Sequence, residues 1–209
     1  MEFTEQEIMF FTSVSHGRKP LGVTLSRPVA EGREQYIEST IQSLTKKGFI
    51  NADGKLTRDG MEMLYFWEQY RNSKKHIAYN STFAAPISEK ALFAVTSTVK
   101  GYDVCFVMPE YIMLNLLKES AYLCMGEEKP GRGKWENLDV IEWLDRINDM
   151  DGSILLREYD YGKQMNEIVY CWTKEEGYLL NLSRRRMRNL SSAVMRKQIY
   201  TMLGGRKNG

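Results

Sequence analysis

The feature that most constrains the fold is a pattern that occurs twice in the sequence. Residues 91–123 have the alternation of two strands joined by a tight turn, followed by the spacing of a long apolar helix. The pattern returns near the C-terminus: when Gly101 is set over Gly177 without a gap, Leu114 falls on Leu190. The sequence therefore predicts two strand-turn-strand-helix halves related by pseudo-twofold symmetry, with the two turn glycines in equivalent positions.

The rest of the chain predicts an α+β fold, with antiparallel sheets and helices in one compact molecule. Gly126–Gly133 is the clearest linker, because it combines three glycines, a proline and several charges. We therefore expect an N-terminal half over residues 1–125 and a C-terminal half over 134–204. Strands are expected over 76–83, 92–99, 102–108, 152–156, 167–173 and 177–182, and the main helices over 4–14, 33–47, 57–67, 109–123, 137–148 and up to residue 203.

An N-terminal segment has the order of elements of a winged helix. The spacing predicts a helix over 33–47, which Gly48 would stop, and then a small hairpin that turns at Gly54. Thr57 can cap the next helix, in which Met61, Leu64, Tyr65 and Trp67 are expected to face inward. The segment 33–66 is thus winged-helix-like.

A winged helix suggests DNA binding, but the charges of this one oppose it. Near its N-terminus, the helix that would enter the major groove has Glu31, Glu34 and Glu38 against Arg33. Lys46 and Lys47 lie only at its far end. Carboxylates in that position repel phosphates. A structural or partner-holding use is therefore the leading interpretation of the segment, and a DNA-binding transcriptional regulator is the alternative.

Composition and charge exclude several classes of protein. The chain of 209 residues is 43% hydrophobic, and 29 basic against 27 acidic residues leave a net charge of only +2, which gives no general attraction to nucleic acid or lipid. The N-terminus is acidic and no apolar run is long enough to span a bilayer, so we expect a cytoplasmic protein. Cys105, Cys124 and Cys171 are unclustered among apolar neighbours, which favours buried thiols.

No catalytic motif is recognisable, so we expect a protein that is not an enzyme and uses no cofactor or metal. The two histidines, His16 and His76, are far apart, and CxxC, HExxH, GxSxG and P-loop patterns are absent from the sequence. We interpret the densest acidic set as a solvated helix surface rather than an acid/base pair or a metal site. It comprises Glu142, Asp145, Asp149 and Asp151.

A dense run of arginines follows the last predicted strand. It comprises Arg184, Arg185, Arg186 and Arg188. Without interleaved aromatic residues to stack bases, a solvated surface is the leading interpretation. If the run is functional, both RNA or phosphate and an acidic protein patch are possible targets, since guanidinium groups pair with carboxylates as well as with phosphates.

Three stretches together resemble the EspG-type chaperones of type VII secretion systems. They are FTEQEIMFF followed by Pro20-Leu21, the segment LTKKGFINADGKLT, and the hairpin YDYGKQMNEIVYCWTKEEGYLLNL that leads into a terminal helix. The order of elements is also similar to that of small EspG-like proteins encoded beside secretion clusters in Gram-positive bacteria. The resemblance covers most of the chain and consists of architecture and pattern.

The resemblance implies a chaperone or adaptor that binds a helical-hairpin secretion substrate of WXG, LXG or PPE-like type, without turnover. It places the contact on residues 136–148 and 166–203, where Met and aromatic side chains would offer an adaptable apolar surface. Core packing is the alternative for each of them. The candidate partner-binding residues are Trp143, Ile147, Tyr170, Trp172, Tyr178, Arg184, Arg185, Met187 and Met195.

Overall fold

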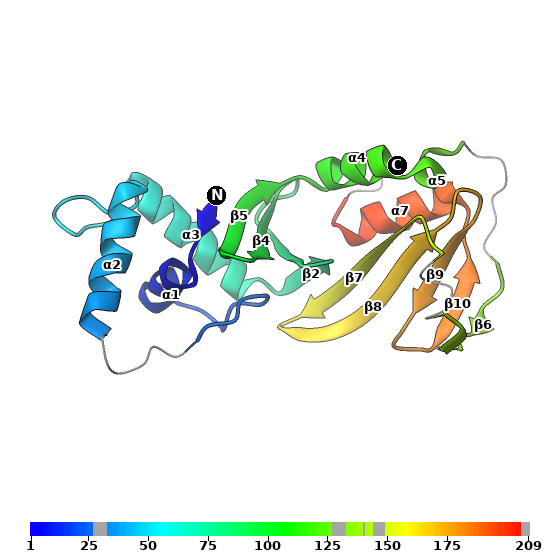
Figure 1. Cartoon of the computed structure of the whole chain (residues 1–209), viewed down its shortest axis with the longest axis horizontal. Coiled ribbons are helices and arrows are strands. Elements are labelled where there is room, and N and C mark those ends of the chain that lie inside the picture. The colour runs from blue at the N-terminus through cyan, green and yellow to red at the C-terminus, as the bar shows by residue number, and fades with distance from the viewer. Residues whose placement is uncertain (27–32, 127–132, 140, 144–148, 206–209) are drawn as a thin grey trace. The chain divides into compact units, whose positions relative to one another are not determined.

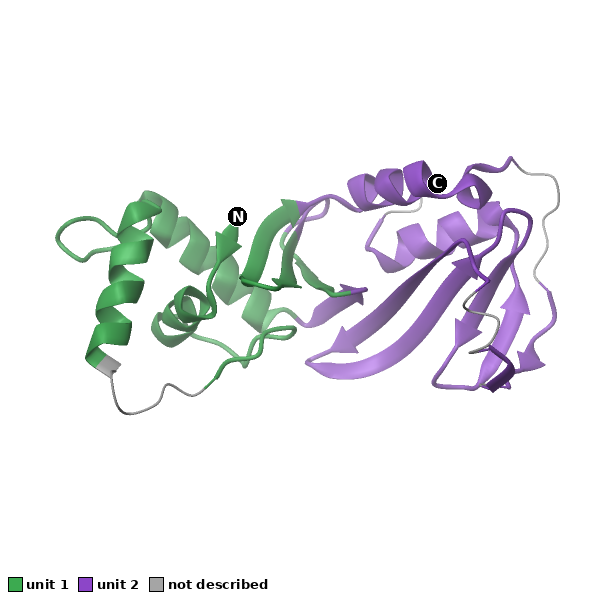
Figure 2. Cartoon of the chain, in the orientation of Figure 1, with its two compact units in different colours: residues 1–73, 81–87, 93–106 green, residues 74–80, 88–92, 107–209 purple. Residues whose placement is uncertain are grey.

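The computed structural model describes residues 1–26, 33–126, 133–139, 141–143 and 149–205, and it shows an α+β fold of helices and antiparallel strands (Figure 1). The chain forms two compact units (Figure 2). Unit 1 comprises residues 1–73, 81–87 and 93–106, and unit 2 comprises residues 74–80, 88–92 and 107–209. The sequence predicted a single division between residues 125 and 134, whereas the units are interleaved along the chain.

Unit 1 combines three helices with strands in the order β1-β5-β4-β3. The two residues of β1 pair antiparallel with β5, so that Phe3 lies opposite Tyr102. The elements are β1 (Glu2–Phe3), α1 (Glu5–Val14), α2 (Arg33–Lys46), α3 (Arg58–Asn72), β3 (Thr82–Pro86), β4 (Leu92–Thr98) and β5 (Gly101–Val107).

The local signals for the helices of unit 1 are confirmed. Thr4 and Glu7 form a capping box at the start of α1, and the Thr57 hydroxyl accepts a hydrogen bond from the backbone N–H of Gly60 at the start of α3. Gly48 follows α2 with a φ of +81°, a left-handed conformation that glycine adopts without a Cβ penalty. Between α2 and α3, Ile50 and Leu56 form the bridge of the predicted hairpin.

Unit 2 is built on strands in the order β2-β7-β8-β9-β10-β6, in which each neighbouring pair is antiparallel. Helices α4, α5 and α7 complete the unit (Figure 1). The elements are β2 (Lys75–Tyr79), α4 (Pro109–Glu119), α5 (Ala121–Cys124), β6 (Glu136–Asn137), β7 (Gly152–Asp160), β8 (Lys163–Trp172), β9 (Gly177–Asn181), β10 (Arg186–Asn189) and α7 (Ser192–Met202).

Both faces of the unit 2 sheet are packed. On one face, side chains of successive strands lie side by side and are buried: Ile154, Leu156, Tyr170, Trp172 and Leu179. On the other face, Cys171 and Leu180 belong to a buried cluster that includes Leu138 and Trp143. Adjacent side chains of a strand point to opposite faces. Because both faces are covered, nearly every residue is buried in the second half of β8 and in β9.

Several predicted elements differ from the structure. The helix expected over 109–123 is interrupted at Ser120 and forms α4 and α5. The single strand expected over 76–83 is two strands, because Asn80 adopts a φ of +51° and the chain turns there between β2 and β3. The second copy of the repeated pattern contains an additional strand, β10, before its helix. Leu190 therefore precedes α7, whereas Leu114 lies within α4, and the ungapped correspondence does not extend to the helices.

The two turn glycines are each required, but by different neighbours. Gly101 has a φ of +143°, and a Cβ there would lie 2.3 Å from the carbonyl oxygen of Phe3. At Gly177 a Cβ would lie 2.4 Å from the ring of Tyr122. The lack of a Cβ at Gly101 allows the backbone of Phe3 to approach closely, and the lack of one at Gly177 allows the ring of Tyr122 to do so.

Candidate protein-binding surfaces

Most of the aromatic and methionine residues predicted to contact a partner are core residues. The exposed fractions of Trp143, Tyr170, Trp172 and Met195 are 3%, 1%, 5% and 0%. Burial also raises the pKa of the Tyr170 hydroxyl and raises that of the Cys171 thiol to about 12. The prediction that these four side chains present an accessible contact surface is wrong, because the sheet that carries or faces them is covered on both sides.

The other predicted contact residues have different positions. Tyr178 and Met187 are half-buried against Trp143, whose ring lies 5.2 Å from that of Tyr178 and whose Nε1 donates a hydrogen bond to the Met187 sulfur. Arg184 and Arg185 are exposed. Ile147 lies outside the described residues. The expectation of buried thiols holds for Cys171 and is wrong for Cys105 and Cys124, which are exposed.

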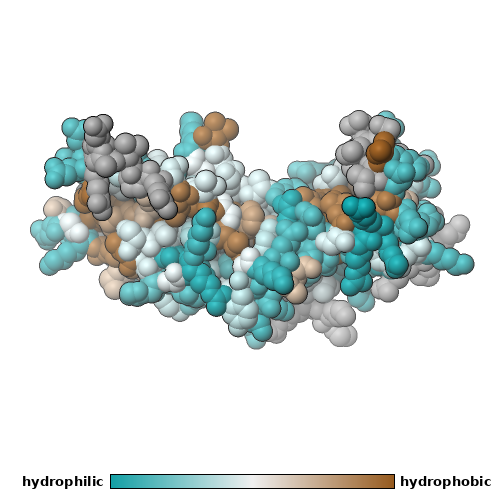
Figure 3. All heavy atoms as spheres, turned by 90° about the horizontal axis from the view of Figure 1, so that it is seen from below, coloured by the Kyte–Doolittle hydropathy of each residue, from teal (hydrophilic) through white to brown (hydrophobic). Residues whose placement is uncertain are grey.

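Hydrophobic side chains do reach the surface elsewhere. Figure 3 shows a face on which hydrophilic residues dominate and hydrophobic residues gather in separate patches. In unit 1 four such side chains come from α3 and the end of β5, and we call them the aromatic platform. They are Met61, Tyr65, Phe66 and Phe106.

The rings of the aromatic platform support one another. Phe66 lies 5.2 Å from Tyr65 and 4.8 Å from Phe106, in edge-to-face geometry in both cases. Beneath them the buried ring of Phe93 lies 5.6 Å from that of Phe106. Tyr65 and Phe106 are nonetheless each 56% exposed, and Met61 is 62% exposed. The structure therefore holds large apolar groups in place at the surface.

The sequence prediction placed Met61 and Tyr65 on the inward face of α3, and this is wrong. The side chains that point into the core are Met63, Trp67 and Tyr70, at positions i, i+4 and i+7. Both sets have helical spacing, so periodicity alone could not separate them. The signal available in the sequence was the size of the side chains in the second set, because Trp67 and Tyr70 together offer more apolar surface to bury than Met61 and Tyr65.

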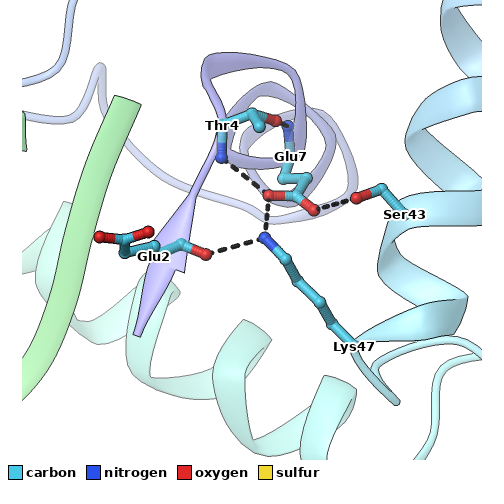
Figure 4. A network of polar contacts seen from close by, with 5 residues as sticks. All are labelled: Glu2, Thr4, Glu7, Ser43 and Lys47. Carbon is cyan, nitrogen blue, oxygen red and sulfur yellow. Dashed lines mark hydrogen bonds and ion pairs between the residues drawn. The ribbon is translucent and has the colours of Figure 1, made fainter. Parts of the chain in front are cut away.

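A buried carboxylate joins the N-terminal segment to α2 (Figure 4). Glu7 is fully buried, and its oxygens accept hydrogen bonds from the Thr4 backbone N–H at 2.8 Å, the Ser43 hydroxyl at 2.8 Å and the Lys47 ammonium at 2.6 Å. Burial disfavours the charged form, but these donors outweigh it, and the pKa of Glu7 is lowered from 4.5. Lys47 also donates to the Glu2 carbonyl oxygen at 2.8 Å.

A buried guanidinium secures the end of α1. Arg71 of α3 is 8% exposed and donates to the carbonyl oxygens of Thr12, Ser15, Gly17 and Arg18 at distances of 2.7 to 3.1 Å. The last carbonyl groups of a helix have no partner within the helix, so side-chain donors are needed wherever that end is buried. Arg71 thus fixes how α1 leaves the core on its way toward Pro20.

In unit 2 four arginines lie along β10 and the turn before it, three of them exposed and Arg188 half-buried; with a neighbouring tryptophan we call them the basic edge. Arg188 of β10 lies with its guanidinium carbon 4.4 Å from the ring centre of Trp135, which comes from the segment leading into β6 and is 42% exposed. No aromatic residue is interleaved with the arginines in the sequence, and the pairing of β6 with β10 supplies one. The basic edge comprises Trp135, Arg184, Arg185, Arg186 and Arg188.

Comparison with known proteins places the chain in a family. The model described as Domain of unknown function (DUF5081) matches residues 1–206. The chain belongs to this family. A search of curated proteins found no match.

Chemical signs of other kinds of site are few in the part of the chain that the structure describes. No group of three His, Cys, Asp or Glu side chains there could hold a metal ion, and no helix there is long and apolar enough to cross a membrane. Glu142, Asp149 and Asp151 are exposed, and Asp145 lies outside the described residues. An open, shallow hollow is lined by Asp151, Thr173, Lys174, Glu175 and Glu176.

Proposed function

We propose that the protein is a non-enzymatic cytoplasmic chaperone or adaptor that binds a helical-hairpin partner, as the resemblance to EspG-type chaperones of type VII secretion implies. The observation that carries the proposal is the aromatic platform. Exposed rings that are fixed by contacts with a buried ring lose little conformational entropy when a partner covers them. Tyr, Phe and Met are also enriched where proteins meet.

The proposal puts the contact in the first half of the chain, whereas the resemblance implies the second. The reason is burial, because Trp143, Tyr170 and Trp172 are not accessible. Met61 and Tyr65 lie one helical turn apart on α3, and Phe106 widens the surface beside Phe66. A partner helix with apolar residues at positions i, i+3 or i+4 could lay its apolar face on this surface.

The winged-helix-like segment has a structural role in this proposal. Its helix α2 presents Glu34 and Glu38 as exposed side chains, and its Lys47 is engaged with Glu7. These features favour a scaffold over a DNA-binding transcriptional regulator, which stays the alternative. A regulator predicts binding to duplex DNA from upstream of its own gene, with an affinity that falls steeply as salt rises. We also propose that β4–β5 and β8–β9 are related copies of one strand-turn-strand scaffold.

Co-expression with helical-hairpin proteins encoded near this gene tests the chaperone proposal. A tagged partner should retain the protein through size-exclusion chromatography, and the double substitution Tyr65→Ser/Phe106→Ser should weaken the complex about tenfold or more, as expected for the loss of two aromatic anchors. Val99→Ser is the matched control, because Val99 is an apolar side chain of unit 1 that is fully exposed outside the platform.

Two results would contradict the proposal. Failure of every neighbouring helical-hairpin protein to form a complex at micromolar concentration would count against the function itself. If the complex forms and the double substitution does not weaken it, the proposed function would stand, but the aromatic platform would not be the binding site. A gel-shift with upstream DNA in the same samples decides on the regulator.

A further inference from the structure

The sheet of unit 2 ends in an exposed edge. β6 is the last strand in the order, and its segment is bonded to β10: Arg186 lies opposite Asn137, the Gly133 N–H donates to the Asn189 carbonyl oxygen at 3.0 Å, and the Leu138 N–H donates to the Arg185 carbonyl oxygen at 3.0 Å. Residues 133–137 are all exposed. The other side of this extended segment has no neighbouring strand among the described residues, and such an edge can accept one.

The charge along this edge is positive. Lys134, Arg184, Arg185 and Arg186 are exposed, and the three arginines form no ion pair with any residue that the structure describes. Two acids lie in the same stretch, Glu136 and Asp139. Asp139 is already used, because its Oδ1 accepts hydrogen bonds from the backbone N–H groups of Ile141 and Glu142. The edge therefore carries a local surplus of cations although the whole chain is close to neutral.

The aromatic residue of the edge indicates a peptide rather than a nucleic acid. One face of the Trp135 ring is occupied by the Arg188 guanidinium, which leaves no pair of stacking surfaces such as single-stranded nucleic acids use. Glu136 lies in the middle of the exposed segment and would repel a continuous phosphate backbone. A peptide with carboxylates at alternate positions can avoid it.

We propose that the basic edge binds an acidic, extended peptide segment of a partner protein, which adds to the sheet as a strand beside β6. Backbone hydrogen bonds to residues 133–137 supply sequence-independent affinity. The guanidinium groups of Arg184, Arg185 and Arg186 pair with carboxylates of the added strand. This interaction goes beyond the proposed helical contact, since it involves other residues and another kind of partner segment.

The test uses a fluorescent peptide of about ten residues, the length of a long strand, in which Glu alternates with Thr and Val. Fluorescence anisotropy with the full-length protein should show binding that weakens about tenfold between low and moderately high salt. The same peptide with alternate amides N-methylated keeps its charge but cannot pair as a strand, and it should bind at least about tenfold more weakly.

Charge-reversal variants separate the edge from general electrostatics. The triple substitution Arg184→Glu/Arg185→Glu/Arg186→Glu should abolish binding. The control Lys19→Glu/Lys46→Glu/Lys55→Glu makes the same change in net charge at exposed positions of unit 1 and should leave binding unchanged. Far-ultraviolet circular dichroism checks that each variant is folded.

Three results would overturn the inference. Equal affinity for the methylated and unmethylated peptides would exclude strand addition. Tighter binding of a labelled oligouridine than of the peptide would assign the edge to nucleic acid. Absence of binding to the unmethylated peptide at low salt would remove the site altogether. None of these depends on the helical partner, so the chaperone proposal stands or fails separately.

Discussion

Both units bury aromatic rings, but they differ in the charged groups that they bury and in the side chains that they leave at the surface. Unit 1 buries the charged groups of Glu7 and Arg71 and leaves Tyr65 and Phe106 at the surface. Unit 2 buries aromatic rings on both faces of its sheet and leaves its arginines along an edge and a turn. Residue type alone would have assigned these side chains the other way round.

The difference follows from how each unit satisfies its backbone. In unit 1, both ends of α1 lie against the core. Its terminal N–H and carbonyl groups therefore need hydrogen-bond partners from side chains. Glu7 and Arg71 supply them. In unit 2 most backbone groups bond to neighbouring strands, so the faces can be filled with apolar groups.

The largest expected effect tests the aromatic core of unit 2. Trp172→Ala removes a ring that is 5% exposed. The ring packs so closely on Gly152 that a Cβ at this glycine would lie 2.8 Å from it. We expect the free energy of unfolding of unit 2 to fall by about 3–5 kcal/mol, the usual cost of a large cavity. Hydrogen exchange by mass spectrometry should show faster exchange in β7–β9. Trp135→Ala, at a ring that is 42% exposed, should cost much less. Equal losses of stability would show that the burial of Trp172 does not determine its contribution.

The next prediction removes the buried guanidinium of unit 1. Arg71→Met keeps an apolar stem but leaves the carbonyl oxygens at the end of α1 without donors, and we expect a loss of about 3 kcal/mol. Urea unfolding, with hydrogen exchange in α1 as a local probe, measures it. Arg58→Met is the control because the Arg58 side chain is 90% exposed. A loss no larger than that of the control would show that burial of Arg71 is incidental.

Glu7→Gln removes the buried carboxylate and is expected to cost about 2 kcal/mol at neutral pH, since Lys47 loses its charged partner. The pKa of Glu7 is lower in the folded protein than its ordinary value of 4.5. The stability that it contributes is therefore fully present above that value and is lost as the pH falls through the lower folded pKa. Urea unfolding at a series of pH values should give a flatter acid limb for Glu7→Gln than for Glu62→Gln.

The smallest expected effect concerns the turn of the basic edge. Arg185 adopts a φ of +49°, a left-handed conformation that is unfavourable for a side chain with a Cβ. Arg185→Gly should raise the stability of unit 2 by about 0.5 kcal/mol, because the relief of strain slightly exceeds the entropic cost of glycine. The urea midpoint measures it. Lower stability would mean that the Arg185 side chain contributes packing that offsets the strain.

The sequence predicted local features, such as helix caps and turns, better than the contacts between segments that are distant in the chain. The capping box at Thr4, the turn at Gly48 and the cap at Thr57 each depend on neighbouring residues, and all are present. The strand pair around Gly101 and the start of the following helix at Pro109 were also placed correctly. Such features need only the chain within one helical turn or hairpin.

Features that depend on distant segments were not predictable in the same way. The aromatic platform requires Phe106 to meet Phe66, and the basic edge requires Trp135 to meet Arg188. No periodicity in the sequence encodes either contact. The burial of Tyr170 and Trp172 likewise depends on cover for the sheet, which an alternating strand pattern cannot reveal.

The interleaving of the two units has a consequence for synthesis and inheritance. Unit 1 is complete only when residue 106 has been made, since β1 pairs with β5, and by then the ribosome has already produced β2, which belongs to unit 2. β2 must wait for β7 to emerge before it gains the partner with which it pairs. No single break in the chain separates the units, so one recombination event at a single position cannot exchange one unit and leave the other intact.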